Sequence, residues 1–440
     1  LQRPIVLLAG RARARQHATN LHRFRAGSSY LYFGGPPVPG AALIVEPGSD
    51  GVAGTTLVRQ PAEFEESVWT GKPPDDADLA RAAGLRDRAL MAPDAVHDWL
   101  GDRVGSWVGP PCPPTLAWAS SVGLEAARPE ELEPIIELRL VQDEHEVQAM
   151  RRAVQASVDG HLAAMRATRP GATEAHVAAA LTGALIARGC GVSFTPIVTT
   201  RGEVLHSERY GNVLEDGRLL LVDAGAEEPG GYAADMTRTY PVGGRFSDVQ
   251  RRLYDVVVRA ERVAIASCVP GKRYRDIHDL AAHVLCQGLI EADLVRGDPH
   301  ELAGRSVHTL FFPHGLGHLI GLDVHDMEDF GDLVGYEAGR ARRKAFGSKY
   351  LRLDRDLKAG MTVTIEPGLY LAPAIWNNAE LVAPFSDVVN RPAVDALLND
   401  RFGGIRVEDM VHVTTGEPDI LTRDLPYAAD DVTAIVGQPQ

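Results

Sequence analysis

The chain has 440 residues, of which 45% are hydrophobic, so it is long enough to bury a sizeable core and to form more than one domain. Its formal net charge of −14 argues against a protein that follows nucleic-acid phosphates, so we expect small molecules or peptides as partners and no nucleic acid. No apolar stretch approaches bilayer-spanning length, which predicts no membrane association.

The cysteines and the opening residues indicate a cytoplasmic protein. Four cysteines are scattered without close pairs: Cys112, Cys190, Cys268 and Cys286. That spacing is typical of reduced thiols in a core rather than of a disulfide framework or a zinc knuckle. The opening LQRPIVLLAGRARARQ is apolar first and basic second, the reverse of a secretory signal.

The front of the chain, residues 1–135, is predicted to be a smaller mixed α/β domain without a catalytic constellation. Its apolar runs predict three strands and one weaker helix, at Ile5–Leu8, Ser29–Phe33, Ala41–Val45 and Ala77–Leu90. The Pro-rich run Gly109–Pro114 and an acidic run from Glu125 to Glu133 follow, before the first strong helical pattern. We therefore expect the domain boundary next to Ile136.

The remaining residues, 136–440, repeat one order of elements. Apolar residues at helical spacing predict a helix over Glu144–Thr168, which Pro170 and Gly171 end, and Thr173 then caps a second helix through Ala187. The same order returns further along, with a helix through Leu253 and Ala264, a break at Pro270–Gly271 and a helix through Ile277 and Leu285. This repetition predicts an internal duplication with four strands around one cleft.

Each predicted half continues into strand-like runs that carry acidic residues. In the first half, Asp223 ends the run LLLVD, and a turn through Gly230 and Gly231 returns the chain so that Asp235 lies beside it. A hairpin therefore brings these two acids together.

In the second half, alternation in TVTIEPG puts Glu366 on the face opposite Val363 and Ile365. In GIRVEDMVHV, Arg406 and Glu408 share one face of a single predicted strand. We expect Arg406 to hold Glu408 ionised, because a neighbouring cation favours a carboxylate.

Histidines gather in HGLGHLIGLDVHD, which is too irregular for a zinc-binding helix. His314, His318 and His325 stand among small residues there, and this arrangement indicates a tight loop and strand that line a site. His206, which precedes Asp223 by a short loop, is a fourth candidate.

Together these residues predict a hydrolytic site with two metal ions, held by Asp223, Asp235, His318, Glu366 and Glu408. Carboxylates cannot be gathered at the edge of a core without a large penalty from desolvation and repulsion unless cations neutralise them. Any one of these acids alone is more often a turn residue or half of an ion pair, so the prediction depends on their co-occurrence. Mostly oxygen ligands with one nitrogen favour Mn²⁺, with Co²⁺, Zn²⁺ and Fe²⁺ as alternatives.

The strings LVDAG, DMTRTYPV, HGLGHLIGLDVHD, TIEPGLY and GIRVEDMV resemble the proline-specific branch of the pita-bread metallopeptidases, the aminopeptidase P and prolidase group. The resemblance covers Ile136–Leu425 in motif order, and HRFRAGSSYLYFGG is similar to the amino-terminal domain of that group. It implies an α+β protein: a mixed α/β domain followed by a pita-bread catalytic domain with a pseudo-two-fold repeat. It also implies a homodimer.

The resemblance also implies the roles of the site residues. Asp235 and Glu408 would bridge the metals, Asp223 would be a further ligand, and His318 the lone nitrogen ligand. Glu366 would both bind metal and transfer the proton. The remaining candidates would contact substrate, stabilise the developing oxyanion, line the proline pocket or support the acids: His206, His314, His325, Tyr370 and Arg406.

Two segments depart from the pattern and leave the shape of the cleft open. An insertion, 374–404, separates Glu366 from Glu408, and the hairpin between the two aspartates looks one residue longer than expected. The segment 328–360 is rich in basic residues: Arg340, Arg342, Arg343, Lys344, Lys349, Arg352 and Arg355. Such a run is usually a solvated face, but one of these arginines could bind the free carboxylate of a dipeptide.

The predicted function is hydrolysis of the Xaa-Pro bond at the amino end of peptides. We favour an Xaa-Pro dipeptidase (prolidase) slightly, with aminopeptidase P, which acts on longer peptides, as the alternative. Methionine aminopeptidase is less favoured because that group generally lacks a front domain of this size. Metal-free creatinase-like relatives and non-catalytic binding modules typically lose ligands that are intact in this chain.

Overall fold

The computed structural model describes residues 3–17, 19–46, 54–60, 68–69, 71–72, 74–82, 84 and 90–439. Contacts divide the chain into two units, Leu1–Arg139 and Leu140–Gln440. The expected boundary next to Ile136 lies within helix α6 (Pro129–Leu140), so the division falls at the end of that helix.

The first unit is built on a six-stranded sheet in the order β4-β3-β2-β1-β5-β6. Its central strand β1 pairs antiparallel with β2 and parallel with β5, so the sheet is mixed. The strands are β1 (Ile5–Leu8), β2 (Ala42–Glu46), β3 (Gly54–Val58), β4 (Leu90–Met91), β5 (Gly105–Val108) and β6 (Leu124–Ala126). The helices besides α6 are α1 (Ser28–Tyr32), α3 (Asp76–Ala82), α4 (Ala95–Leu100) and α5 (Pro113–Ser121).

Two of the three predicted strands in this unit are confirmed as β1 and β2, but the strand at Ser29–Phe33 is wrong. These residues form helix α1, in which Tyr30 is buried and its hydroxyl donates to the Pro36 carbonyl at 2.8 Å. A five-residue apolar run fits either a strand or one buried helical turn. The helix predicted over Ala77–Leu90 ends at Ala82, residues 83 and 85–89 lie outside the described ranges, and Leu90 begins β4.

The second unit contains the predicted pairs of helices, α7 (Glu144–Ala167) with α8 (Glu174–Ala187) and α9 (Asp248–Ala266) with α10 (Tyr274–Glu291). Side-chain caps fix where α7, α9 and α8 begin, because Asp143 accepts from the Glu146 amide, Ser247 from the Gln250 amide and Thr173 from the His176 amide. The two leading helices, α7 and α9, both carry a capping box. We call α7–α8 with its strands the first repeat and α9–α10 with its strands the second.

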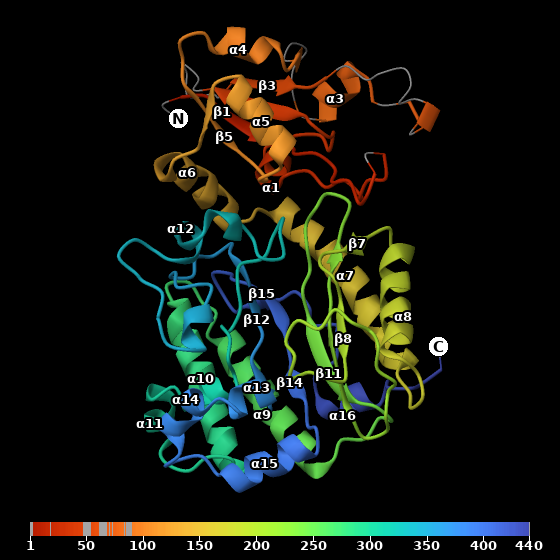
Figure 1. The fold of residues 1–440 in the computed structure, drawn as a ribbon, viewed down its shortest axis with the longest axis vertical. Coiled ribbons are helices and arrows are strands. Elements are labelled where there is room, and N and C mark those ends of the chain that lie inside the picture. The colour runs from red at the N-terminus through yellow and green to blue at the C-terminus, as the bar shows by residue number, and fades with distance from the viewer. Residues whose placement is uncertain are drawn as a thin grey trace. The chain divides into compact units, whose positions relative to one another are not determined.

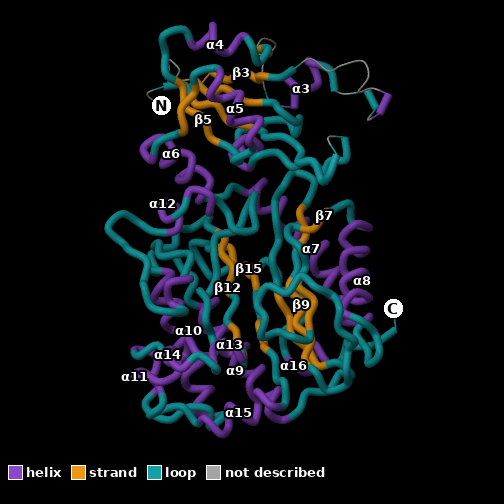
Figure 2. The backbone as a smooth tube through the Cα atoms, viewed as in Figure 1, coloured by secondary structure: helices purple, strands orange, loops and turns teal. Residues whose placement is uncertain are grey.

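The strands of the two repeats form separate small sheets that lie between the two helix pairs (Figures 1 and 2). The first repeat has the antiparallel sheet β11-β9-β8, and the second has β12-β15-β16. Their bounds are β8 (Ile197–Thr199), β9 (Leu219–Asp223), β11 (Thr237–Pro241), β12 (Thr362–Ile365), β15 (Asp409–His412) and β16 (Asp419–Ile420). Two short pairs complete the set: β7 (Gly191–Val192) with β10 (Ala226–Glu227), and β13 (Gly368–Tyr370) with β14 (Gly404–Arg406).

The insertion 374–404 folds as helices on a core of the second repeat. Its residues Ile375, Trp376 and Val394 join the apolar cluster that contains Leu253, from α9, and Leu285, from α10. The shorter helices of this unit are α11 (Pro299–Gly304), α12 (Asp332–Gly335), α13 (Pro373–Trp376), α14 (Ala379–Val382), α15 (Arg391–Asn399), α16 (Ala429–Thr433), η1 (Val307–Leu310), η2 (Glu328–Phe330), η3 (Ser348–Tyr350) and η4 (Ala383–Phe385).

Within the described ranges, no helix combines the length and apolar character needed to cross a membrane. All four cysteines are free, and three of them are buried, as expected for core thiols.

Candidate metal centre

Four carboxylates stand at corresponding ends of strands in the two repeats. Asp223 is the last residue of β9, and Asp235 lies just before β11. Glu366 directly follows β12, and Glu408 directly precedes β15. A bridge between Thr237 and Glu408 connects the two sheets at this point, so the acids of both repeats meet at one place.

The segment that carries His318 is neither a helix nor a full strand. It runs alongside β12, where Leu319 pairs with Val363 and the Thr364 amide donates to the His318 carbonyl. His318 Nδ1 donates to the Leu319 carbonyl at 2.9 Å, which assigns the proton to Nδ1. Its Nε2 therefore presents a lone pair, 3.5 Å from Asp235 Oδ2 and 3.8 Å from Glu366 Oε1.

The chemistry of these side chains fits divalent cations. Among the described residues, one group could hold a metal, with ligand atoms of Asp235, His318 and Glu408 all within 4.8 Å of one another. Three of the candidate ligands have a buried carboxylate oxygen without a hydrogen-bond partner among the described residues: Asp223 Oδ1, Asp235 Oδ1 and Glu408 Oε1. Buried oxygens of this kind are costly unless a cation contacts them.

Burial and mutual repulsion both favour the protonated form of these acids. Burial, followed by the charges of neighbouring carboxylates, raises the pKa of Asp235 and that of Glu408 well above their usual values. Burial also raises the pKa of Glu366 to about 7, although His318 and Arg406 oppose the rise. The side chains alone therefore do not stabilise four charged carboxylates, and bound cations would supply the missing compensation.

Arg406 binds Asp223 directly, and its charge lowers the pKa of Glu408, as expected, but does not outweigh burial and the neighbouring carboxylates. Its Nη2 lies 2.6 Å from Asp223 Oδ2, and its Nε donates to Thr237 Oγ1 at 3.2 Å. Arg406 ends β14 and Glu408 precedes β15, so the two do not share one continuous strand as expected. Glu408 instead accepts a hydrogen bond from Thr237 Oγ1 at 2.7 Å.

Tyr370 connects Arg406 to His314. Arg406 Nη1 donates to the Tyr370 hydroxyl at 2.9 Å, and that hydroxyl lies 2.9 Å from His314 Nε2. His314 Nδ1 donates to the Gly315 carbonyl at 2.8 Å, so Nε2 accepts the tyrosine proton. Burial raises the pKa of Tyr370 to about 12 and holds that of His314 well below its usual value, so both are neutral at pH 7. The Tyr370 side chain is therefore fully buried between Arg406 and His314 and does not form an exposed surface of a pocket.

The other two histidines lie at the margins of this cluster. The His325 ring packs edge-on against His318 with 4.2 Å between ring centroids, and its Nδ1 lies 3.4 Å from Glu328 Oε2. His206 is exposed and makes no hydrogen bond to the described residues, although partial burial and the charge of Arg406 lower its pKa. The structure thus brings His314 and His325 against the metal ligands but leaves His206 without a direct contact.

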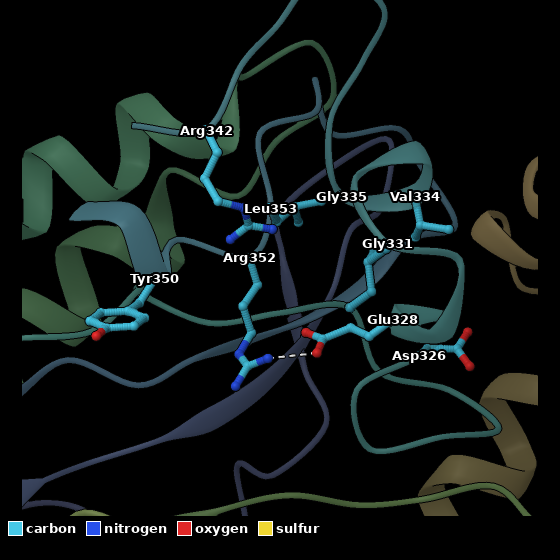
Figure 3. Close-up of a pocket in the computed structure, with 10 residues that line it drawn as sticks. Asp326, Glu328, Gly331, Val334, Gly335, Arg342, Tyr350, Arg352 and Leu353 are labelled. Carbon is cyan, nitrogen blue, oxygen red and sulfur yellow. Dashed lines mark hydrogen bonds and ion pairs between the residues drawn. The ribbon is translucent and has the colours of Figure 1, made fainter. Parts of the chain in front are cut away.

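A cavity of about 170 Å³ is lined by Glu328, the partner of His325, and is drawn in Figure 3. Its wall includes Leu319, Asp326 and Glu328, and also Tyr350 and Arg352 from the basic segment. Arg352 Nη1 donates to Glu328 Oε2 at 2.5 Å.

Most arginines of the basic segment are fixed by local partners. Arg340 binds Asp356, Arg342 binds Asp332, Arg343 binds Asp279, and Arg355 donates to backbone carbonyls. These contacts hold the segment in place, whereas Arg352 contacts Glu328, the same carboxylate that His325 contacts.

The structure adds a buried arginine that the sequence analysis did not single out. Arg238 is fully buried and donates to the carbonyls of Thr237 and Glu408 at 2.9 and 2.7 Å. Its Nη2 also donates to Asp409 Oδ1 at 2.7 Å, which is a buried ion pair. The available signal was a charged residue in the middle of the strand-like string TRTYP, because an arginine that is buried in a strand requires several acceptors.

Comparison with known proteins identifies relatives along nearly the whole chain. Residues 148–415 match the model of metallopeptidase family M24. A probable Xaa-Pro aminopeptidase from Penicillium rubens is 32% identical, over 94% of this chain and 88% of the relative. One with the same description from Aspergillus niger is 30% identical, over 98% of this chain and 92% of the relative.

Solved structures agree with this assignment. Proline aminopeptidase P II from Yersinia pestis superimposes with a TM-score of 0.81 at 25% identity, covering 98% of this chain and 94% of that one. Zinc-substituted Escherichia coli aminopeptidase P in complex with product gives 0.82 at 25% identity, covering 99% and 95%. The chain therefore belongs to metallopeptidase family M24, within its proline-specific pita-bread group of metallo-exopeptidases.

Proposed function

We propose that this protein is a dinuclear-metal Xaa-Pro aminopeptidase that releases the first residue from peptides with proline at the second position. The observation that carries the proposal is the convergence of buried acids around His318, in a chain whose relatives bear the aminopeptidase name over 94% of its length. The dipeptidase that we favoured from the sequence is supported less well than this alternative, because the named relatives and solved structures are aminopeptidases.

The residues that would hold two divalent ions are Asp223, Asp235, His318, Glu366 and Glu408. Their donors, mostly oxygen with one nitrogen, favour Mn²⁺, with Co²⁺, Zn²⁺ and Fe²⁺ as alternatives. When bound, such ions lower the pKa of a coordinated water from about 16 towards 7 and so supply a nucleophile at neutral pH.

Around that nucleophile, the side chains of this chain would manage protons and charge. Glu366 would take a proton and pass it to the leaving nitrogen, which matters because the proline amide nitrogen carries no hydrogen of its own. His325 would contact the substrate and help to neutralise the developing oxyanion, and His206 would contact the substrate. Arg406 would hold Asp223 in place, and Tyr370 would orient His314.

Prolidase activity remains the second candidate because Arg352 stands beside His325, where it could bind a dipeptide carboxylate. Its ion pair with Glu328 already engages part of the guanidinium, which counts against that clamp. The test is a metal-reconstitution assay with Mn²⁺ on Ala-Pro, Ala-Pro-Gly and Met-Ala-Ser. We expect release of alanine from the tripeptide. Cleavage of Ala-Pro alone would identify a dipeptidase, and release of methionine would identify a methionine aminopeptidase.

We also propose a cytoplasmic homodimer. The free cysteines support a reducing compartment, and the dimer is proposed from the family resemblance. Light scattering on the eluted peak of a size-exclusion column measures the mass in solution. The mass of a single chain would contradict the proposed dimer.

A further inference from the structure

Glu328 contacts both His325 and the basic segment. Its Oε2 atom lies 3.4 Å from His325 Nδ1 and 2.5 Å from Arg352 Nη1. Figure 3 shows Glu328 and Arg352 reaching towards each other from different parts of the chain at the cavity. The carboxylate that contacts His325 is thus itself held by Arg352, which lies 24 positions after Glu328 in the chain.

This contact decides which nitrogen of His325 is available to a ligand. With Nδ1 directed at Glu328, Nε2 is the nitrogen left for substrate. The ring also packs edge-on against His318, a candidate ligand, at 4.2 Å between centroids. A partner of this kind fixes both the rotation of an imidazole and the position of its proton.

Arg352 makes Glu328 a firm support. A charge-assisted bond at 2.5 Å is short and strong for its type, and it limits the rotation of the carboxylate. Burial opposes ionisation of Glu328, but its contacts with His325 and the charge of Arg352 outweigh burial and lower its pKa to about 2. Glu328 is therefore ionised across the neutral range.

We propose that Glu328, anchored by Arg352, is a positioning residue that orients His325 for the substrate. This inference rests on the proposed function, in which His325 contacts the peptide. The competing explanation is that the Glu328–Arg352 pair only fastens the basic segment to the rest of the unit. The pair of Arg342 and Asp332, in the same segment, has that fastening geometry without a histidine and offers a matched control.

The kinetic test compares Glu328→Ala, Glu328→Asp and the control Asp332→Asn in the full-length enzyme with Mn²⁺ and Ala-Pro-Gly. We expect Glu328→Ala to lower kcat about 10- to 100-fold, the usual cost of losing such a partner, with little change in KM. Glu328→Asp should recover part of the loss, and Asp332→Asn should match the wild type.

A double-mutant cycle then separates orientation of His325 from a general structural role. In a His325→Ala background, removing Glu328 should cost nothing further, because the residue through which it acts is gone. An equal loss in both backgrounds, or a wild-type rate for Glu328→Ala, would overturn the proposal.

A measurement that does not depend on catalysis tests the orientation of His325 separately from the proposed peptidase activity. Crystal structures of the metal-free wild type and Glu328→Ala should show one His325 ring orientation in the former and more than one in the latter. An unchanged ring in the variant would overturn the positioning role. A wild type that cleaves no Xaa-Pro peptide would instead overturn the proposed function, and the ring orientation would still decide the structural claim.

Discussion

Arg406 and Asp223 form a buried ion pair that joins the second repeat to the first, with 2.6 Å between Nη2 and Oδ2. The same guanidinium contacts Thr237 and Tyr370, so three donors of one side chain meet three different elements of the site. Its planar fork suits this task, whereas a lysine ammonium on a flexible stem does not.

Replacement of Arg406 by alanine should lower kcat/KM by about two orders of magnitude. Truncating one partner of a buried charge pair leaves the other unpaired, and Asp223 would then repel its neighbouring acids. Arg406→Lys should recover little, because an ammonium cannot reach all three partners. Steady-state kinetics check this, with the exposed pair of Arg401 and Glu215 supplying Arg401→Ala as control. Near wild-type activity in the lysine variant would contradict it.

Tyr370→Phe should lower kcat about tenfold and leave metal binding unchanged. The hydroxyl accepts from Arg406 and donates to His314, and bonds that involve a charged group contribute about 1.5 to 3 kcal/mol. Calorimetric titration with Mn²⁺ separates the two effects. Tyr254→Phe, which removes a hydroxyl that donates to the Tyr427 carbonyl, is the matched control. Loss of Mn²⁺ affinity with unchanged kcat would place Tyr370 in a different role.

Asp235→Asn should have opposite effects on stability with and without metal. In metal-free protein, burial and the neighbouring carboxylate of Asp223 disfavour the charged form of Asp235, so the neutral amide should raise the Tm by a few degrees. With Mn²⁺ present the wild type should be the more stable, because the amide is a weaker ligand. Thermal scans in chelator and in Mn²⁺ measure both, with Asp430→Asn as an exposed control. A lower Tm for the metal-free variant would contradict the repulsion.

Two buried histidines outside the centre predict a loss of stability in acid. Burial lowers the pKa of His278 to about 4 and that of His308 to about 3, and neither ring has a hydrogen-bond partner in the described structure. Asp279 opposes these shifts, while Arg343 adds to them. Unfolded histidine titrates near 6.5, so the unfolded chain binds protons first and the free energy of unfolding falls from about pH 6.5 to 4.

His308→Leu should flatten that dependence. Urea unfolding at pH 7 and pH 5 gives the two midpoints, and the gap between them should be smaller in the variant. His176→Leu, at an exposed position, should keep the wild-type gap. An equal gap between the two urea midpoints in the wild type, His308→Leu and His176→Leu would show that the buried histidines do not cause the loss of stability in acid.

The paired helices were predictable because their signals are local. Thr173 caps α8 by accepting from an amide only three residues later in the chain. The apolar positions of α7 and α9 recur at helical spacing. The four candidate carboxylates were equally visible, since each stands at or beside the polar end of a buried strand. In contrast, Ser29–Phe33 was misjudged because five residues carry too little periodicity to separate a helix from a strand.

The partners of the charged residues were not predictable in the same way. Arg406 and Asp223 are 183 positions apart, and their contact depends on how the sheets of the two repeats meet. Arg238 reaches Glu408 across a similar separation, and Glu328 meets Arg352 only after the basic segment folds back. Pairing over such distances is a property of tertiary packing that spacing does not encode.

The division of carboxylates between the repeats, two from each, has a consequence for ancestry. A single copy of the helix-and-strand unit supplies Asp223 and Asp235, or Glu366 and Glu408, and so holds only half a centre. Such a copy gains a complete ligand set only by associating with another like itself. Tandem fusion would make that association permanent and would let the copies specialise, and only the second copy contributes a histidine, His318, that faces the acids.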